Sequence, residues 1–126
     1  MIQKQKDLLL RDLCGRLPYG VKCSFGVDDA IYEITGVNPR SCGASEIQAT
    51  HIKSSINGDF RLNSYKPYLF PMSSMTEEQL TDLTKFVANG IMDENIVYDW
   101  FNKNHIDYRG LIPMGLANDA TGKNIY

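Results

Sequence analysis

Residues 46–65 read EIQATHIKSSINGDFRLNSY, and this stretch decides the predicted fold. Asn57 and Gly58 both accept positive φ angles, which suits the tight turn of a β-hairpin. We therefore predict one strand over residues 46–56 and its partner over residues 59–65. The apolar side chains of the first strand change parity along its length, and a regular strand cannot change faces. A bulge or strong bend is therefore expected near His51.

Two more strands are predicted upstream of this hairpin. In residues 21–25 the side chains of Val21, Cys23 and Phe25 share one side, which suits a half-buried strand. Residues 30–37 predict the next strand after a turn. The sheet is thus expected to be small, bent and antiparallel, with three to five strands, or to form a partial barrel.

Helical patterns flank the predicted sheet. Residues 3–14 predict a helix with Gly15 as its C-terminal cap and with a buried stripe, Leu10, Leu13, Cys14 and Leu17. Thr76 and Gln79 fit a capping box that begins a second helix, which ends at Asn89-Gly90 and buries Leu80, Leu83 and Val87. A third helix is predicted over residues 94–104, with four residues in the core: Ile96, Val97, Trp100 and Phe101.

These elements predict an α+β fold in one domain of 126 residues. It comprises a helix in residues 1–17, the sheet in 20–70, a helical part in 76–117 and a loosely held tail in 118–126. Pro67 and Pro71 are expected to prevent regular pairing in residues 66–72, so that this segment lies extended over the core.

Composition narrows the range of functions. The formal net charge is −2, with 13 basic and 15 acidic residues, which argues against a nucleic-acid partner. No apolar run approaches the ~20 residues that span a bilayer, and the N-terminus lacks the apolar region of a signal peptide. We expect a cytoplasmic protein without membrane contact.

Three cysteines and one histidine are candidate zinc ligands: Cys14, Cys23, Cys42 and His51. Structural zinc sites usually use closely spaced ligand pairs, and none is present here. Without an export signal, the odd number of cysteines favours reduced thiols. No metal or other cofactor is predicted.

His105 and Asp107 are the remaining candidates for chemistry. An Asp–His pair can act as a general base, but residues two apart usually point away from each other, and the sequence places no nucleophile beside them. We expect His105 to contact the last carbonyl groups of the third helix. Asp107 is expected to cap a short turn through Leu111 by accepting backbone N–H groups. The sequence contains no phosphate-binding loop, dinucleotide fingerprint, nucleophile elbow or H-E-x-x-H motif, so no catalytic residue is assigned.

Four residues are instead predicted to form an interaction surface: Tyr65, Tyr68, Tyr108 and Arg109. Tyrosine and arginine are enriched among the residues that dominate protein–protein binding. This prediction rests on residue type alone, and the chain holds seven tyrosines.

Three blocks of the sequence resemble a group of small uncharacterised proteins from gut Bacteroidota and their phages or mobile elements. They are DLCGRLPYGV at 12–21, KPYL and PMSSMTEE within 66–78, and DWFN, His105, DYRGLI and GLA within 99–117. The family's acidic, Pro-Gly-containing tail is replaced here by NDATGK at 118–123. The resemblance implies a bacterial or prophage context, and it supplies no catalytic residues.

The leading hypothesis is a non-catalytic module that binds a protein partner. One alternative is an accessory protein that binds nucleic acid with tyrosine and arginine side chains of the curled sheet. Another is a small enzyme or ligand sensor without a recognisable motif.

Overall fold

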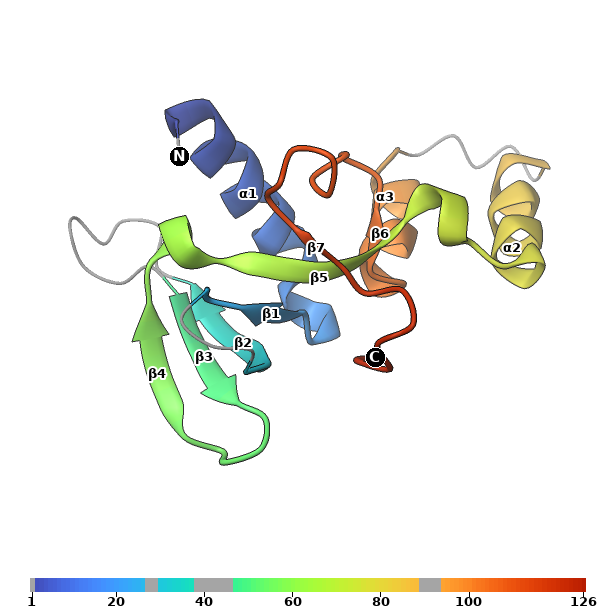
Figure 1. Cartoon of the computed structure of the whole chain (residues 1–126). Helices are drawn as coiled ribbons and strands as arrows, with labels where there is room; N and C mark the ends of the chain where they lie inside the picture. The colour runs from blue at the N-terminus through green and yellow to red at the C-terminus, as the bar shows by residue number, and fades with distance from the viewer. Residues whose placement is uncertain (1, 27–29, 38–46, 89–93) are drawn as a thin grey trace.

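The structure of the protein is a computed structural model that describes residues 2–26, 30–37, 47–88 and 94–126. It confirms the α+β class, with an N-terminal helix, a mixed open sheet and two further helices (Figure 1). The helices are α1 (Gln3–Arg16), α2 (Glu77–Ala88) and α3 (Glu94–Lys103), with short 3-10 turns η1 (Leu17–Tyr19), η2 (Leu62–Ser64) and η3 (Met72–Ser74). The strands are β1 (Lys22–Ser24), β2 (Tyr32–Val37), β3 (Ile47–His51), β4 (Asn57–Phe60), β5 (Lys66–Pro71), β6 (Ile106–Asp107) and β7 (Asn118–Asp119).

The sheet is larger than the predicted antiparallel sheet of three to five strands. Seven strands of the described residues pair in the order β4-β3-β2-β1-β5-β6, and β7 also pairs with β5. The first four pairings along this order are antiparallel, whereas β6 and β7 run parallel to β5. Over the described residues the sheet is therefore open and mixed, and it is not a partial barrel.

The hairpin exists, but its turn lies earlier than predicted. Asn57 and Gly58 belong to β4, where they pair with Thr50 and Ala49. The reversal runs over residues 52–56 and is closed by the His51 N–H, which donates to the Ile56 carbonyl at 2.9 Å. A Cβ at position 58 would lie 2.8 Å from the Phe60 ring, so this glycine makes room for Phe60.

The irregularity predicted near His51 lies instead on the neighbouring strand. The register between β2 and β3 shifts between Ile34 and Gly36, so that the bulge is in β2. The parity change that suggested a bend has another cause, because β3 ends at His51 and Ile52 and Ile56 are exposed in the turn.

Residues 66–71 form the central strand β5, which corrects the prediction of an unpaired extended segment. Pro67 and Pro71 cannot donate hydrogen bonds, but the residues between them pair on both sides. The Phe70 N–H donates to the His105 carbonyl, and the Leu69 carbonyl accepts from the Ala120 N–H, each at 2.8 Å. The two prolines thus lie in a strand that pairs with both β6 and β7.

The predicted loose tail is in fact packed against the sheet. β7 pairs with Tyr68 and Leu69 of β5, and the side chains of Ala120 and Ile125 are buried. With β6 inside residues 76–117, the C-terminal third therefore contributes two strands to the sheet as well as helices.

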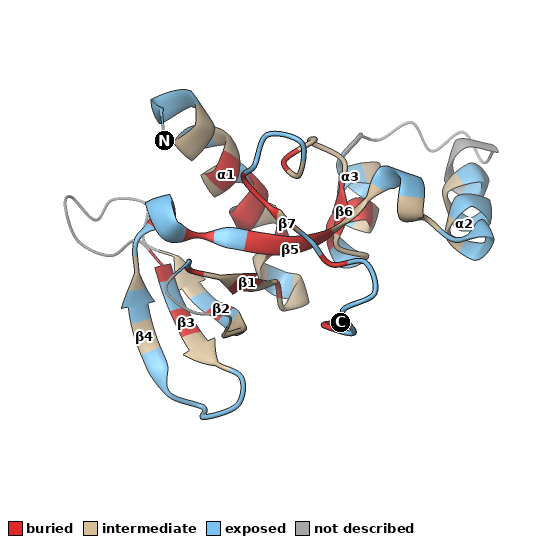
Figure 2. Ribbon diagram, in the orientation of Figure 1, coloured by how far each residue is buried: buried red, intermediate tan, exposed pale blue. Residues whose placement is uncertain are grey.

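Strand β5 is buried or half-buried over most of its length (Figure 2). Its side chains contribute to two apolar clusters. Leu69 belongs to the main core with Leu9 and Leu13 of α1, and Tyr68 packs with Ala120 and Ile125. In β1, Val21, Cys23 and Phe25 are buried as predicted.

Helix α1 runs through Gly15 to Arg16, so Gly15 is not the predicted cap. The left-handed residue that follows is Gly20, after η1, with φ 68°. Gly15 instead faces α3, since a Cβ there would lie 2.9 Å from the Asn102 amide nitrogen.

The capping box at the start of α2 is confirmed. The Thr76 hydroxyl accepts from the Gln79 N–H at 3.2 Å, and the Gln79 side chain accepts from the Thr76 N–H at 3.0 Å. The predicted burial of this helix is not confirmed for Leu80, which is 47% exposed, and Leu83 is half-buried. The end predicted at Asn89-Gly90 lies outside the described residues. α2 lies at the end of the molecule opposite β4 (Figure 1).

Helix α3 begins as predicted and ends at Lys103. Phe101 is buried, Trp100 and Val97 are half-buried, and Ile96 is exposed, which corrects its predicted place in the core. No helix among the described residues has the length and apolar character needed to cross a membrane.

Candidate functional site

A buried ion pair in α1 forms the base of the candidate site. Asp12 and Arg16 lie one helical turn apart, and the Arg16 Nε donates to Asp12 Oδ2 at 2.8 Å. Both side chains are fully buried. Arg16 also donates from Nη2 to the Ile106 carbonyl of β6 at 2.7 Å, so the pair ties the first helix to the C-terminal third of the chain.

A second arginine shares the same carboxylate. The Arg109 Nε donates to Asp12 Oδ1 at 3.2 Å, and the Arg109 side chain is 21% exposed. Two guanidinium groups on one carboxylate leave this cluster with one net positive charge. Arg109 is therefore anchored from inside while part of it faces solvent.

Both guanidinium groups lie close to the Tyr108 ring. The Arg16 guanidinium carbon lies 5.6 Å from the centre of the Tyr108 ring, and that of Arg109 lies 4.9 Å away. Tyr98 of α3 stacks on Tyr108 at 5.0 Å and 14°, and it is 42% exposed. We call these three residues the Tyr98–Tyr108–Arg109 surface.

Asp107 holds the backbone that carries Tyr108 and Arg109. Its two carboxylate oxygens accept the N–H groups of Leu111 and Ile112 at 2.8 and 2.9 Å. This confirms the predicted cap and explains the burial of Asp107, since a buried carboxylate needs such donors. Both oxygens of the Asp107 carboxylate are thus used in capping the turn.

His105 follows α3 by two residues and has a positive φ of 57°. Its backbone N–H donates to the Asn102 carbonyl at 3.1 Å, while its ring stacks on Tyr126 with 3.6 Å between centres. Burial, together with the positive charges of Arg16 and Lys22, lowers the pKa of His105 to about 4. The imidazole is therefore neutral at physiological pH.

Within the described residues, four buried polar atoms have no hydrogen-bond partner. They are Arg16 Nη1, Tyr65 Oη, Asn102 Oδ1 and His105 Nδ1. Burial raises the pKa of the Tyr65 hydroxyl well above its usual value, and the charge on Arg16 partly opposes this. Arg16 lies in the first of the three sequence blocks, Asn102 and His105 lie in the third, and Tyr65 lies between β4 and β5.

The structure divides the four residues of the predicted interaction surface into two pairs. Tyr65 is fully buried and Tyr68 is 8% exposed, so these two lie inside the molecule. Tyr108 and Arg109 are half-buried and lie together. Sequence reasoning missed Tyr98, Asp12 and Arg16. The signal for the ion pair is present, because the buried positions of α1 are Leu9, Asp12, Leu13 and Arg16, a regular i, i+3, i+4, i+7 stripe.

The candidate zinc ligands that the structure describes lie in different environments. Cys14 is exposed on α1, and Cys23 is buried in β1, where burial raises its thiol pKa. His51 is half-buried and accepts from the Ser54 N–H, and Cys42 lies outside the described residues. In the part of the chain that the structure describes, no three His, Cys, Asp or Glu side chains gather as metal ligands would.

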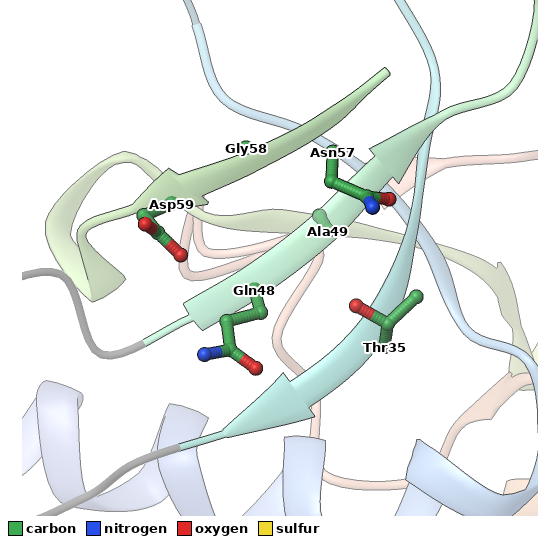
Figure 3. A pocket seen from close by; sticks show the side chains of 6 residues that line it. All are labelled: Thr35, Gln48, Ala49, Asn57, Gly58 and Asp59. Atoms are coloured by element: carbon green, nitrogen blue, oxygen red, sulfur yellow. The ribbon is translucent and has the colours of Figure 1, made fainter. Parts of the chain in front are cut away.

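The face of the sheet opposite the main core carries two open hollows. One of about 420 Å³ is lined by Thr35, Gln48, Ala49, Asn57, Gly58 and Asp59 (Figure 3). The other, of about 350 Å³, is lined by Lys22, Glu33, Thr50, His51, Ile52 and Ser55. In Figure 3 the polar side chains stand apart along the strands, so this face presents separate hydrogen-bonding groups and no nucleophile–base pair among those drawn.

In comparisons with known proteins, no family model, curated protein or solved structure matches this chain.

Proposed function

We propose that the protein is a non-catalytic binding module that recognises a protein partner through the Tyr98–Tyr108–Arg109 surface. The observation that carries this proposal is the way the surface is built. Arg109 and Tyr108 reach solvent while they are held from below by Asp12 and Arg16, which are fully buried.

Rigid aromatic and arginine side chains are effective binding groups because little conformational entropy is lost when they are covered. The Tyr98 ring, 42% exposed, offers apolar area, and Arg109 offers unpaired donors beside it. A partner with an apolar patch beside a carboxylate matches this chemistry.

The proposed partner belongs to a bacterial or prophage cytoplasm, as the resemblance of the three sequence blocks implies. The test is an affinity capture from a Bacteroidota lysate with three baits: the wild type, Tyr98→Ala and Ile56→Ala. Ile56 is the matched control, because it is apolar, 68% exposed and located in the β3–β4 turn. Each capture is run with and without nuclease.

The proposal requires one stoichiometric protein that is retained after nuclease by the wild type and Ile56→Ala and lost with Tyr98→Ala. Crosslinks from that protein must map to α3 or to residues 108–109. Equal capture by all three baits contradicts the proposal. Loss of every partner on nuclease treatment, together with binding to DNA or RNA by fluorescence anisotropy, supports the nucleic-acid alternative.

A further inference from the structure

The hydroxyl of Tyr126 occupies a gap between two strands of the sheet. In the β1–β5 register, Cys23 faces Pro67 and Ser24 faces Lys66, so the next pair in this direction would be Lys22 and Tyr68. The Lys22 N–H donates to Tyr126 Oη at 2.8 Å, and Tyr126 Oη donates to the Tyr68 carbonyl at 2.9 Å. The Lys22 carbonyl lies 3.3 Å from the same hydroxyl and is a second, longer acceptor. The phenol thus links the backbones of Lys22 and Tyr68.

The ring of Tyr126, which keeps 39% exposure, is flanked by groups that suit an aromatic ring. His105 stacks on it with 3.6 Å between centres and 12° between planes. Lys22 Nζ lies 5.5 Å from the ring centre, and the Phe70 ring lies 6.0 Å away. Burial raises the pKa of the Tyr126 hydroxyl, so the group remains a donor as well as an acceptor at neutral pH.

A short segment after β7 delivers Tyr126. Residues 121–124 are exposed, and both Gly122 and Asn124 have positive φ. The Ala120 N–H donates to the Leu69 carbonyl, and Lys22 Nζ donates to the Ile125 carbonyl at 2.7 Å. Packing of Ala120 and Ile125 on Tyr68, the Lys123 ammonium over the Tyr68 ring, and Tyr126 itself add to these contacts. Breaking these contacts exposes the gap while leaving β1 and β5 joined at Cys23 and Ser24.

We propose that Lys22, Tyr68 and His105 form a binding slot for a 4-hydroxyphenyl group. Tyr126 of the chain itself occupies the slot in this structure, and a tyrosine side chain of another polypeptide takes its place when the C-terminal segment leaves. The chemistry selects tyrosine over phenylalanine, because without the hydroxyl the Lys22 N–H and the Tyr68 carbonyl would be left unpaired.

The test uses the full chain with Tyr126→Ala and the probes 4-methylphenol and toluene, followed by NMR. We expect 4-methylphenol to shift the signals of Lys22, Tyr68 and His105 and to bind at least about tenfold tighter than toluene, as two hydrogen bonds require. N-acetyltyrosinamide should bind likewise, and N-acetylphenylalaninamide should not. The wild type should bind these probes far more weakly, since its own Tyr126 competes intramolecularly.

Ile56→Ala is the matched control, because it removes an exposed apolar side chain in the β3–β4 turn and should leave the response to 4-methylphenol as in the wild type. If Tyr126→Ala is unfolded in buffer, 4-methylphenol should restore its native circular dichroism and toluene should not. Equal effects of the two probes, or binding without shifts at Lys22, Tyr68 and His105, would overturn the proposal.

Discussion

Asp12 and Arg16 form a fully buried ion pair on the face of α1 that also carries Leu9 and Leu13. Arg16 also bonds to the Ile106 carbonyl of β6. Transfer of both charges from water is costly, and the cost is offset only while each group keeps its partners. The pair therefore makes the junction of α1 with the C-terminal third sensitive to any change in either residue.

Replacing Asp12 by Asn should destabilise the protein by about 3–5 kcal/mol, because it leaves two arginines without their carboxylate. Urea denaturation followed by circular dichroism measures this change. Asp7→Asn is the matched control on the same helix, since Asp7 is exposed and accepts only from Gln3. It should change stability by less than about 0.5 kcal/mol. Similar losses for the two variants would contradict the structure.

Asp107→Ala should cost about 2 kcal/mol, because two N–H groups at Leu111 and Ile112 lose their acceptor. Asp107→Asn keeps one acceptor oxygen and should cost less than Asp107→Ala. The midpoint of thermal unfolding distinguishes the two. If Asn were as harmful as Ala, the negative charge rather than the pair of hydrogen bonds would be the important feature.

Stability should fall as the pH decreases from about 6.5 toward 4. The folded protein holds His105 neutral, with its pKa lowered from 6.5 to about 4, whereas the unfolded chain takes up the proton below 6.5. The contribution is fully present above pH 6.5 and, given the partial solvent access of His105, is on the order of 1–2 kcal/mol. Urea denaturation at pH 7 and pH 4.5 should show a smaller decrease for His105→Gln than for the wild type. An equal decrease would assign the pH dependence to other groups.

Leu80→Ala should change stability by less than about 0.5 kcal/mol, since Leu80 is 47% exposed. Leu13→Ala, at a fully buried position, should cost about 2–5 kcal/mol. Comparing the two by chemical denaturation tests the position of α2 directly. A large loss for Leu80→Ala would place this helix against the core, as its sequence pattern predicted.

The phase of α1 illustrates why sequence reasoning reached the right element and the wrong face. Its helical period was clear, but charged residues were assumed to face solvent, which moved the predicted stripe by one residue. The buried face includes Asp12 and Arg16 because each finds a partner, and Arg109 and the Ile106 carbonyl lie far away in the sequence. No local pattern contains that information.

The same limit applies to the sheet. The strands near residues 22–51 could be predicted because their alternation is local. β5 was missed because prolines argue against a central strand, and its pairing with β6 and β7 depends on distant residues. The Asn57-Gly58 pair led to a wrong prediction of the turn position, because Gly58 serves to leave space for the Phe60 ring.

For the candidate site, residue type alone pointed to Tyr108 and Arg109, which lie together. It equally pointed to Tyr65 and Tyr68, which are buried, because composition carries no information about burial. The capping role of Asp107 was predictable, since its donors lie four and five residues ahead in the chain.

The bond between Arg16 and the Ile106 carbonyl spans 90 residues, which has a consequence for synthesis on the ribosome. A nascent chain makes Asp12 and Arg16 first, and their partners Ile106 and Arg109 follow 90 and 97 residues later. Until then the main core lacks Leu111 and Leu116, and β5 lacks its pairing with β6 and β7. Such long-range closure is slow, and it leaves unfinished chains prone to aggregation.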